Sequence, residues 1–336
     1  MRPLARRPVL HPAEYRKLPA INAIRSALVV ALLLAALGQG IVEASAAEYC
    51  PDTQSEIQTD RPDVTNSSFV VPNGSLQVEN GINLTARRAS RTIDGTNTRV
   101  RLGVARCIEL LADLPDYFRS VHGGAPTGFS DVAPAVKAQL GPFPGGVVLS
   151  ATAGLGFPTG ASRISRHGYN PYVQFPWSRE IGGGWSLSGM FTQFWFPGQP
   201  KSNAISEATF VVEREVGAHA DLFVEYVGDY PNHGGPSQVI NTGGAYRFTA
   251  TQQIDFHAGF GLTNRSPSYF FGLGYSVRLT VCSEVRSAPL QIARPIVAAV
   301  RRSVGSVHTI SNKFPLCRVR TIPALYPISG QHFAGT

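Results

Sequence analysis

Apolar and polar residues alternate along most of the chain after residue 75. In the segment 269–279 every odd position is apolar, and the even positions are small or polar except for Phe270. The segments 75–86 and 253–262 repeat the pattern. A period of two puts the two classes of side chain on opposite faces of a β-strand. The pattern predicts strands that face an apolar medium on one side and a polar medium on the other.

The alternation divides the central part of the chain into twelve expected strands, and no later window has a useful helical stripe. The expected strands are 75–86, 98–104, 107–114, 130–140, 146–156, 169–178, 185–196, 207–216, 221–229, 239–248, 253–262 and 269–279.

The expected connections alternate between long and short. The longer ones are 87–97, 115–129, 157–168, 197–206, 230–238 and 263–268, and the shorter ones are 105–106, 141–145, 179–184, 217–220 and 249–252. Bacterial transmembrane barrels have an even number of strands, short periplasmic turns and longer outer loops. Lipid also forbids an unpaired sheet edge. The pattern therefore predicts an all-β fold, a transmembrane antiparallel up-and-down β-barrel of about twelve strands, rather than a soluble β-sandwich.

Aromatic residues near the ends of the expected strands support the membrane interpretation. They are Trp177, Trp185, Trp195, Phe196, Tyr230, Tyr246, Phe248 and Tyr269. Such residues form girdles at the two membrane interfaces. Ordinary packing in a soluble core is the alternative for any one of them.

Charged residues on the less apolar strand faces are the candidate functional residues. The lumen-lining candidates are Glu79, Arg99, Arg101, Glu225, Arg247, Asp255 and Arg278. In the last third of the barrel the signs alternate from strand to strand, which predicts cross-strand ion pairs. Two interpretations stay open, a wall of ion pairs that fills the interior or a lining for a conduit. Inward glycines such as Gly243, Gly259, Gly272 and Gly274 are expected to leave free volume.

Net charge is concentrated in the two ends of the chain. The total is +8, but residues 1–46 hold six basic and two acidic residues and residues 282–336 hold seven and one, which leaves 17 basic and 19 acidic residues between them. The basic balance therefore does not indicate a nucleic-acid partner. Residues 1–46 resemble a signal peptide, with an apolar run at 26–37 and an A-x-A site at 44–46. We expect 281–336 to be a basic, disordered C-terminal extension.

Residues 47–74 precede the first expected strand and are rich in Pro, Asp and Ser. They are expected to form a periplasmic lead-in or a partial plug of the barrel, which itself spans 75–280. Export implies an oxidising compartment, so disulfides Cys50–Cys107 or Cys282–Cys317 are both compatible with the sequence. The four cysteines lack metal-site spacing, and the sequence predicts neither a metal site nor a cofactor.

Catalytic patterns are weak. Asp255 and His257 share a face and Ser276 could neighbour them, but an acyl-transfer triad requires all three groups within hydrogen-bond reach. His257 also lies on the polar face, whereas a membrane lipid hydrolase needs a lipid-facing histidine. We therefore expect no enzymatic activity, and keep a lipid hydrolase as the least favoured alternative.

Several stretches together resemble an outer-membrane transporter family associated with the meta-pathway of phenol degradation. They include Thr59-Asp60-Arg61-Pro62-Asp63, Gln77-Val78-Glu79-Asn80-Gly81, Gly128-Phe129-Ser130-Asp131, the run from Gly154 to Gly160, and Gly272-Leu273-Gly274-Tyr275-Ser276. The resemblance spans about 57–279 and implies an outer-membrane barrel, with a contextual link to aromatic compounds. The extension after Leu279 departs from the family pattern, in which the chain ends on the last strand.

Together these features predict a bacterial outer-membrane barrel that passes small solutes, hydrophobic or aromatic ones included, down their gradient. The expected partners are outer-membrane lipid, the solute and the outer-membrane assembly machinery. The alternative is a closed structural or adhesion barrel that binds partners through its outer loops.

Overall fold

Residues 50, 56–197 and 203–281 are described by the computed structural model, and they contain fourteen strands in one sheet. The first seven are β1 (Ser75–Arg87), β2 (Ser90–Ala105), β3 (Ile108–Asp113), β4 (Tyr117–His122), β5 (Gly128–Phe129), β6 (Ala133–Gln139) and β7 (Val147–Gly156). The others are β8 (Asn170–Gly182), β9 (Trp185–Trp195), β10 (Ala204–Val216), β11 (Ala220–Pro231), β12 (Ser237–Thr249), β13 (Gln252–Gly261) and β14 (Tyr269–Thr280). Within these described ranges, no helix is long and apolar enough to cross a membrane.

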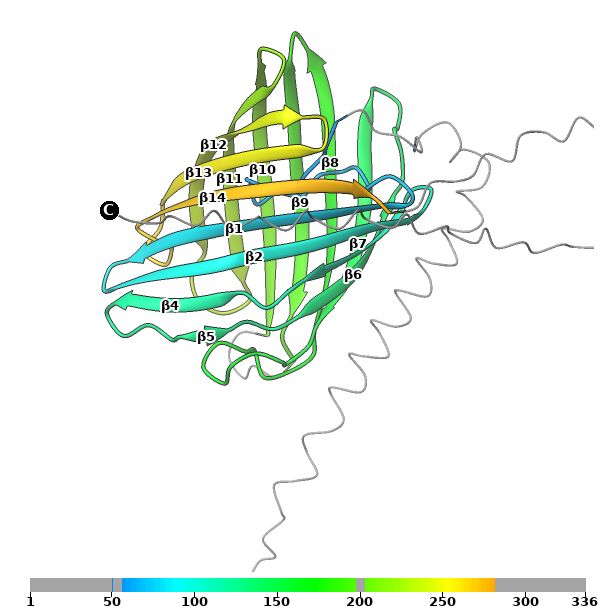
Figure 1. Cartoon of the computed structure of the whole chain (residues 1–336). Helices are drawn as coiled ribbons and strands as arrows, with labels where there is room; N and C mark the ends of the chain where they lie inside the picture. Colours follow the sequence, from blue (N-terminus) through cyan, green and yellow to red (C-terminus); the bar gives the residue numbers. More distant parts are fainter. Residues whose placement is uncertain (1–49, 51–55, 198–202, 282–336) are drawn as a thin grey trace, which may run out of the picture. The chain divides into compact units, whose positions relative to one another are not determined.

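The sheet closes on itself because β1 neighbours both β14 and β2 (Figure 1). β3 and β4 pair with opposite halves of β2, while β6 pairs with β3 and β5 with β4. β3 and β4 together therefore fill one strand position, which is interrupted at 114–116. β5 and β6 together fill the next position, which is interrupted at 130–132. Pro115, which has no backbone N–H to donate, lies in the first interruption. The fourteen segments make twelve strand positions, and the predicted twelve-stranded antiparallel barrel is confirmed.

The predicted alternation of connection lengths is only partly correct. At one end the connections are 88–89, 123–127, 157–169, 196–203, 232–236 and 262–268, and at the other they are 106–107, 140–146, 183–184, 217–219 and 250–251. The segments 87–97 and 115–129, predicted as loops, contain the outer parts of β1 and β2 and the strands β4 and β5. Their sequence does not alternate strictly because, toward the edge of the apolar band and beyond it, the outward face of a strand no longer has to be apolar. The first group of connections is still the longer one overall and marks the outer end.

The burial pattern of the barrel is the reverse of that of a soluble protein. Gln77, Glu79, Arg101 and Glu109 are fully buried, whereas outward-facing Leu273 is 68% exposed. Other large apolar side chains that are more than half exposed are Ile82, Ile181, Val224, Phe129, Phe256 and Phe260. Only an apolar solvent makes such a surface stable, so the strands span a membrane with lipid outside.

Aromatic side chains lie at the strand ends on the outer surface. Those that are exposed include Trp185, Trp195, Tyr230, Tyr246, Phe248 and Tyr269, as expected for interfacial girdles. Two predicted girdle residues differ: Trp177 is half-buried, and Phe196 is only 7% exposed, with the Arg166 guanidinium 4.6 Å from its ring centroid. Phe196 therefore packs in the outer loops and does not face lipid.

The chain divides into two units, Met1–Leu279 and Thr280–Thr336. The expected signal peptide (1–46), the C-terminal extension after Val281, and Cys282 and Cys317 lie outside the described residues. The barrel strands begin at Ser75 and end at Thr280.

Candidate functional site

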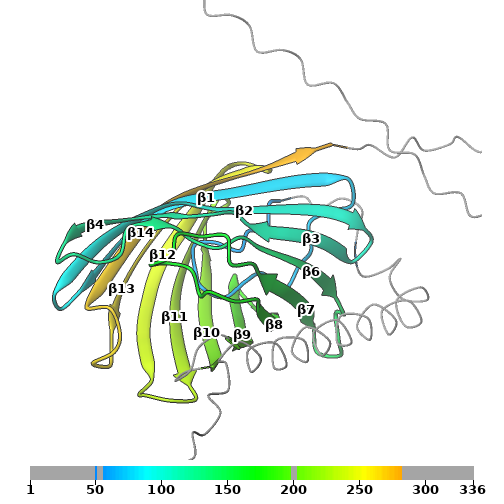
Figure 2. The ribbon, with the colours of Figure 1, turned by 90° about the horizontal axis from the view of Figure 1, so that it is seen from below.

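The polar faces of the strands enclose a lumen, and residues 56–74 lie inside it. We name these residues the lumen segment. In Figure 2 the blue trace of this part of the chain runs within the ring of strands. The buried residues of the segment include Ile57, Asp60, Thr65, Asn66, Ser68, Val70 and Val71. Apart from the bridge from Asn73 to Gly103 at its end, the segment is irregular, so its backbone groups need other partners. Barrel side chains accept from several of its N–H groups, and the Ile57 N–H donates to the Ala250 carbonyl at 2.8 Å.

Asp60 binds the basic wall formed by β2 and β6. Its carboxylate lies 3.1 Å from Arg99 Nη1, 3.2 Å from Arg101 Nη1 and 3.6 Å from Lys137 Nζ. Its backbone N–H donates to Glu79 Oε2 at 3.0 Å. Burial alone would raise the pKa of the Asp60 carboxyl, but the three cations outweigh burial and hold its pKa well below its ordinary value. Asp60 is therefore ionised and serves as the main electrostatic anchor of the lumen segment.

The barrel supplies carboxylates of its own to the same cations. Arg101 pairs with Glu79 and Glu109 at 3.2 and 3.1 Å, and Arg99 pairs with Asp113 at 2.6 Å. Lys137 Nζ lies 3.6 Å from Glu109 Oε1. Arg101, Lys137, Glu79 and Glu109 are fully withdrawn from water, whereas Arg99 and Asp113 are partly exposed. Each of the three cations has at least two carboxylates within reach. Such a network is costly to break from one side, because a buried charge would lose its compensation.

Arg61 points to the opposite wall. Its Nη2 atom lies 3.4 Å from Asp255 Oδ1 on β13. The guanidinium occupies the space that a side chain would need at Gly81 on β1 and at Gly274 on β14, where an added Cβ would overlap it. The two glycines therefore form a recess for Arg61 at the junction of the first and last strands.

The next residues of the segment contact the wall of β10 and β11. The backbone N–H groups of Val64 and Thr65 donate to the Glu225 carboxylate at 2.9 to 3.1 Å. The Thr65 hydroxyl lies 2.8 Å from Glu225 Oε1 and 2.5 Å from Thr209 Oγ1. Burial, followed by the nearby Glu225 and Glu213, raises the pKa of Asp63 well above its ordinary value. Asp60 and Asp63 thus differ in role although they are three residues apart.

The last part of the segment returns along β8, β6 and β3. Asn66 Nδ2 donates to Gln174 at 3.1 Å, and the Ser68 and Ser178 hydroxyls are 2.6 Å apart. The backbone N–H of Val70 donates to Gln139 and that of Val71 to Glu109. The segment thus contacts most of the circumference of the lumen before it enters β1.

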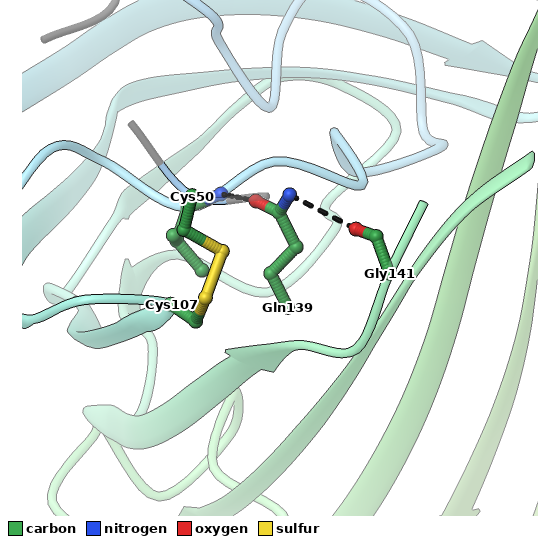
Figure 3. The surroundings of a disulfide bond; sticks show 5 residues. Cys50, Cys107, Gln139 and Gly141 are labelled. Carbon is green, nitrogen blue, oxygen red and sulfur yellow. Dashed lines mark hydrogen bonds between the residues drawn. A yellow bond between two sulfur atoms is a disulfide. The ribbon is translucent and has the colours of Figure 1, made fainter. Parts of the chain in front are cut away.

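A disulfide between Cys50 and Cys107 ties the chain ahead of the lumen segment to the turn between β2 and β3 (Figure 3). Gln139 lies beside it and donates to the carbonyl of Gly141 at 3.1 Å. This is one of the two pairings that the sequence allowed. With the start of β1, it fixes both ends of the lumen segment.

Each of the seven predicted lumen residues contacts the lumen segment. Five of them, Glu79, Arg99, Arg101, Glu225 and Asp255, make the contacts described above. Arg247 lies 3.0 Å from the Glu56 carboxylate, and Arg278 donates to the Glu56 carbonyl at 3.0 Å. The sequence pattern did not identify their main partners, Asp60, Arg61 and Thr65. The only available signal was the charge-dense stretch Thr59–Asp63 ahead of the first strand.

Two expectations about the lumen were wrong. The predicted ion-pair ladder from Glu225 through Arg247 to Asp255 does not form, because the register places Asn241 opposite Glu225 and Ala245 opposite Asp255. Arg247 pairs instead with Asp221 and Glu56. The expected free volume at the inward glycines is filled as well. Phe270 covers Gly259 and His257 covers Gly272, as Arg61 covers Gly274.

The suspected catalytic triad is not assembled. Asp255 pairs with Arg61, and His257 Nε2 lies 3.1 Å from Asn83 Oδ1. His257 lies opposite Gly272 in the register, whereas Ser276 lies opposite Gln253. Four residues along a strand correspond to about 13 Å, which is beyond direct proton transfer.

The family to which the chain belongs follows from comparison with known sequences. The family described as "Putative MetA-pathway of phenol degradation" matches residues 59–279. The chain belongs to this family. The match begins at Thr59, so it includes most of the lumen segment as well as the barrel. No curated protein matches the chain significantly.

Solved structures with a similar arrangement of strands are outer-membrane proteins. An outer membrane channel from Pseudomonas putida F1 is 13% identical, with a TM-score of 0.46 over 62% of this chain and 97% of that one. The KdgM porin is 7% identical, with a TM-score of 0.43 over 60% of this chain and 98% of that one. Neither similarity is high enough to carry a functional inference. The lipid-facing apolar surface, the closed sheet and the family membership place this barrel in the bacterial outer membrane.

Proposed function

We propose that this family member is an outer-membrane channel for small solutes, and that the lumen segment is its resident plug. The observation that carries the proposal is the way the segment is held. Side chains such as Glu225, Thr209 and Gln174 bind its middle, which is not a strand of the sheet and can leave without breaking the barrel. Backbone bonds from Ile57 to Ala250 and from Gly74 to Gly103 hold its two ends. In this division residues 47–74 are the plug and its lead-in, and 75–280 are the channel wall.

Hydrophobic or aromatic solutes are the proposed cargo, and the support for this is the family's link to phenol degradation. The proposed transport is passive and involves no covalent chemistry. The seven lumen residues serve in the closed state as the seat of the plug, and in the open state they line the path. A wall that carries both signs of charge would not select strongly between anions and cations.

A closed structural or adhesion barrel is the second candidate, because a lumen filled by the chain itself needs no conduit. The fully buried charge network around Arg101 and Asp60 favours this candidate. The two candidates differ in whether the lumen segment moves.

The test is solute flux into liposomes that contain a chain with a reversible lock on the plug. The Thr65 and Thr209 hydroxyls are 2.5 Å apart, so the double variant Thr65→Cys/Thr209→Cys should form a disulfide that holds the segment against β10. We expect phenol entry in the reduced state and a fall of at least about fivefold in the oxidised state. The flux falls because molecules whose plug is held by the new disulfide no longer open.

The matched control is Thr85→Cys/Thr92→Cys, which joins two residues already paired between β1 and β2. Oxidation of this control should leave the flux unchanged. The reductant also breaks the native Cys50–Cys107 disulfide in both variants, so the reduced control measures how much that loss alone changes the flux. Equal flux in the locked and unlocked proteins would refute the plug role. Flux no greater than in empty liposomes would favour the structural barrel.

A further inference from the structure

Every exposed charged side chain at the outer end of the barrel, among the described residues, is basic. The exposed arginines of this end are Arg87, Arg88, Arg91, Arg119, Arg163, Arg166 and Arg265. The carboxylates nearest to this end, Asp94, Asp116 and Asp131, are buried or half-buried. At the opposite end the exposed charges are mixed and include Arg179, Glu180 and Glu215. The two membrane faces of the protein are therefore electrostatically different.

Part of this charge lies on the outside of the wall formed by β2 and β4. The register places Arg119 opposite Ile93 and His122 opposite Arg91. Arg91 and Arg119 therefore lie on the same outward face as Ile93, with an irregularity of the register at Arg91 and Thr92 between them. We name Arg88, Arg91, Arg119 and His122 the outer basic patch. All four side chains are exposed, and neither Arg91 nor Arg119 forms an ion pair within the described ranges.

The side chains next to the patch are apolar and exposed. Ile93, Tyr117 and Val121 are 39–47% exposed, and the Tyr117 and Phe129 rings are 4.9 Å apart. β2 is 16 residues long, or about 53 Å, whereas the apolar band of such a barrel is about 25 Å tall. The patch thus lies where the lipid-facing surface ends and the headgroup region begins.

The turn at 88–89 is held against the next connection around the ring. Arg88 Nη2 donates to Asn264 Oδ1 at 2.5 Å, and Arg87 Nη1 donates to the Arg265 carbonyl at 3.1 Å. These bonds bring the Arg265 backbone to the same edge. Guanidinium groups of like charge repel one another, and an anion that lies among them relieves this repulsion.

We propose that the outer basic patch binds the phosphate groups of a phosphorylated glycolipid in the outer leaflet, with its acyl chains on the apolar surface beside Tyr117 and Ile93. Arginine suits this partner because its planar fork donates two hydrogen bonds to one phosphate. The adjoining apolar side chains suit the acyl chains, which a soluble phosphate ion lacks.

The test is the affinity of the purified full-length chain for bis-phosphorylated lipid A and for the dephosphorylated form with the same acyl chains. We expect the phosphorylated form to bind at least about tenfold more tightly, since each arginine near anionic headgroups strengthens binding. The double variant Arg91→Gln/Arg119→Gln should lose most of this preference. The control Arg106→Gln/Arg179→Gln, which removes two arginines from the opposite end, should keep it.

Heat-modifiable gel mobility checks that each variant is folded, and the single variant Arg119→Gln replaces the double variant if that one does not fold. Equal affinity of the wild-type chain for the two lipids would overturn the proposal. So would a double variant that keeps the full preference. Full displacement of lipid A by millimolar inorganic phosphate would show a free-phosphate site instead, and would also refute it.

Discussion

Replacing Asp60 by asparagine is expected to release the lumen segment while the barrel stays folded. The variant loses ionic contacts to Arg99, Arg101 and Lys137 that lie 3.1 to 3.6 Å away in a buried setting. Loss of one partner in a buried network costs about 3 kcal/mol, or roughly a hundredfold in the equilibrium between seated and released segment. Glu79, Glu109 and Asp113 still compensate the cations, so the strands should not unfold.

Hydrogen exchange measures this release directly. The amides of Val64, Thr65, Val70 and Val71 donate to barrel side chains. Their exchange should be about a hundredfold faster in Asp60→Asn, with the strand amides unchanged. Asp63→Asn is the matched control. Asp63 faces Glu225 and Glu213, and its raised pKa indicates that its charged form is disfavoured. This control should exchange at the wild-type rate or more slowly. Unchanged exchange in Asp60→Asn would refute the anchor role.

Reduction of the Cys50–Cys107 disulfide is expected to have the second large effect. The bond joins residues 57 apart in sequence, and loop-closure entropy assigns such a crosslink about 4 kcal/mol. Reduction frees one end of the lumen segment, and only the connection to β1 then retains it covalently. We expect the heat-modifiable form to convert at a lower temperature, and limited proteolysis to cleave within 56–74.

Two cysteine variants separate this bond from the rest of the chain. Cys50→Ser/Cys107→Ser should behave like the reduced wild-type protein, and a reductant should not change it further. Cys282→Ser/Cys317→Ser should keep the full response to reductant, because both residues lie outside the barrel strands. A wild-type chain whose conversion temperature is the same with and without reductant would show that the bond contributes nothing to stability.

The fold could be predicted from the sequence wherever a strand lies between lipid and a polar lumen. In 269–279 the two media impose opposite side chains at successive positions, and β14 matches this segment to within one residue. The pattern failed for 87–97 and 117–122, where the strands extend past the membrane and neither face must be apolar. The alternation that lipid and lumen impose therefore reveals a strand within the membrane, but it does not show where that strand ends outside the membrane.

The contents of the lumen could be predicted only in part. The inward face of each strand predicted Glu79, Arg101 and Glu225 as lumen-lining residues, because alternation alone assigns a face. Their partners depend on a segment without periodicity, whose path is set by long-range contacts such as Asp60 with Lys137 and Arg61 with Asp255. The inward glycines suggested empty space because the strand pattern does not show what lies opposite them. The recess at Gly274 is filled by the side chain of Arg61, which is far from Gly274 in the sequence.

The central claim is that the lumen segment lies inside the closed barrel, and crosslinking Thr65 to Thr209 tests it most directly. In a Cys282→Ser/Cys317→Ser background, the folded Thr65→Cys/Thr209→Cys variant should form the 65–209 disulfide nearly completely on mild oxidation. Peptide mapping of the oxidised protein would then recover the two residues in one linked fragment. If both cysteines instead stay free and react fully with a maleimide in the folded, heat-modifiable protein, the segment is outside the lumen and the account is wrong.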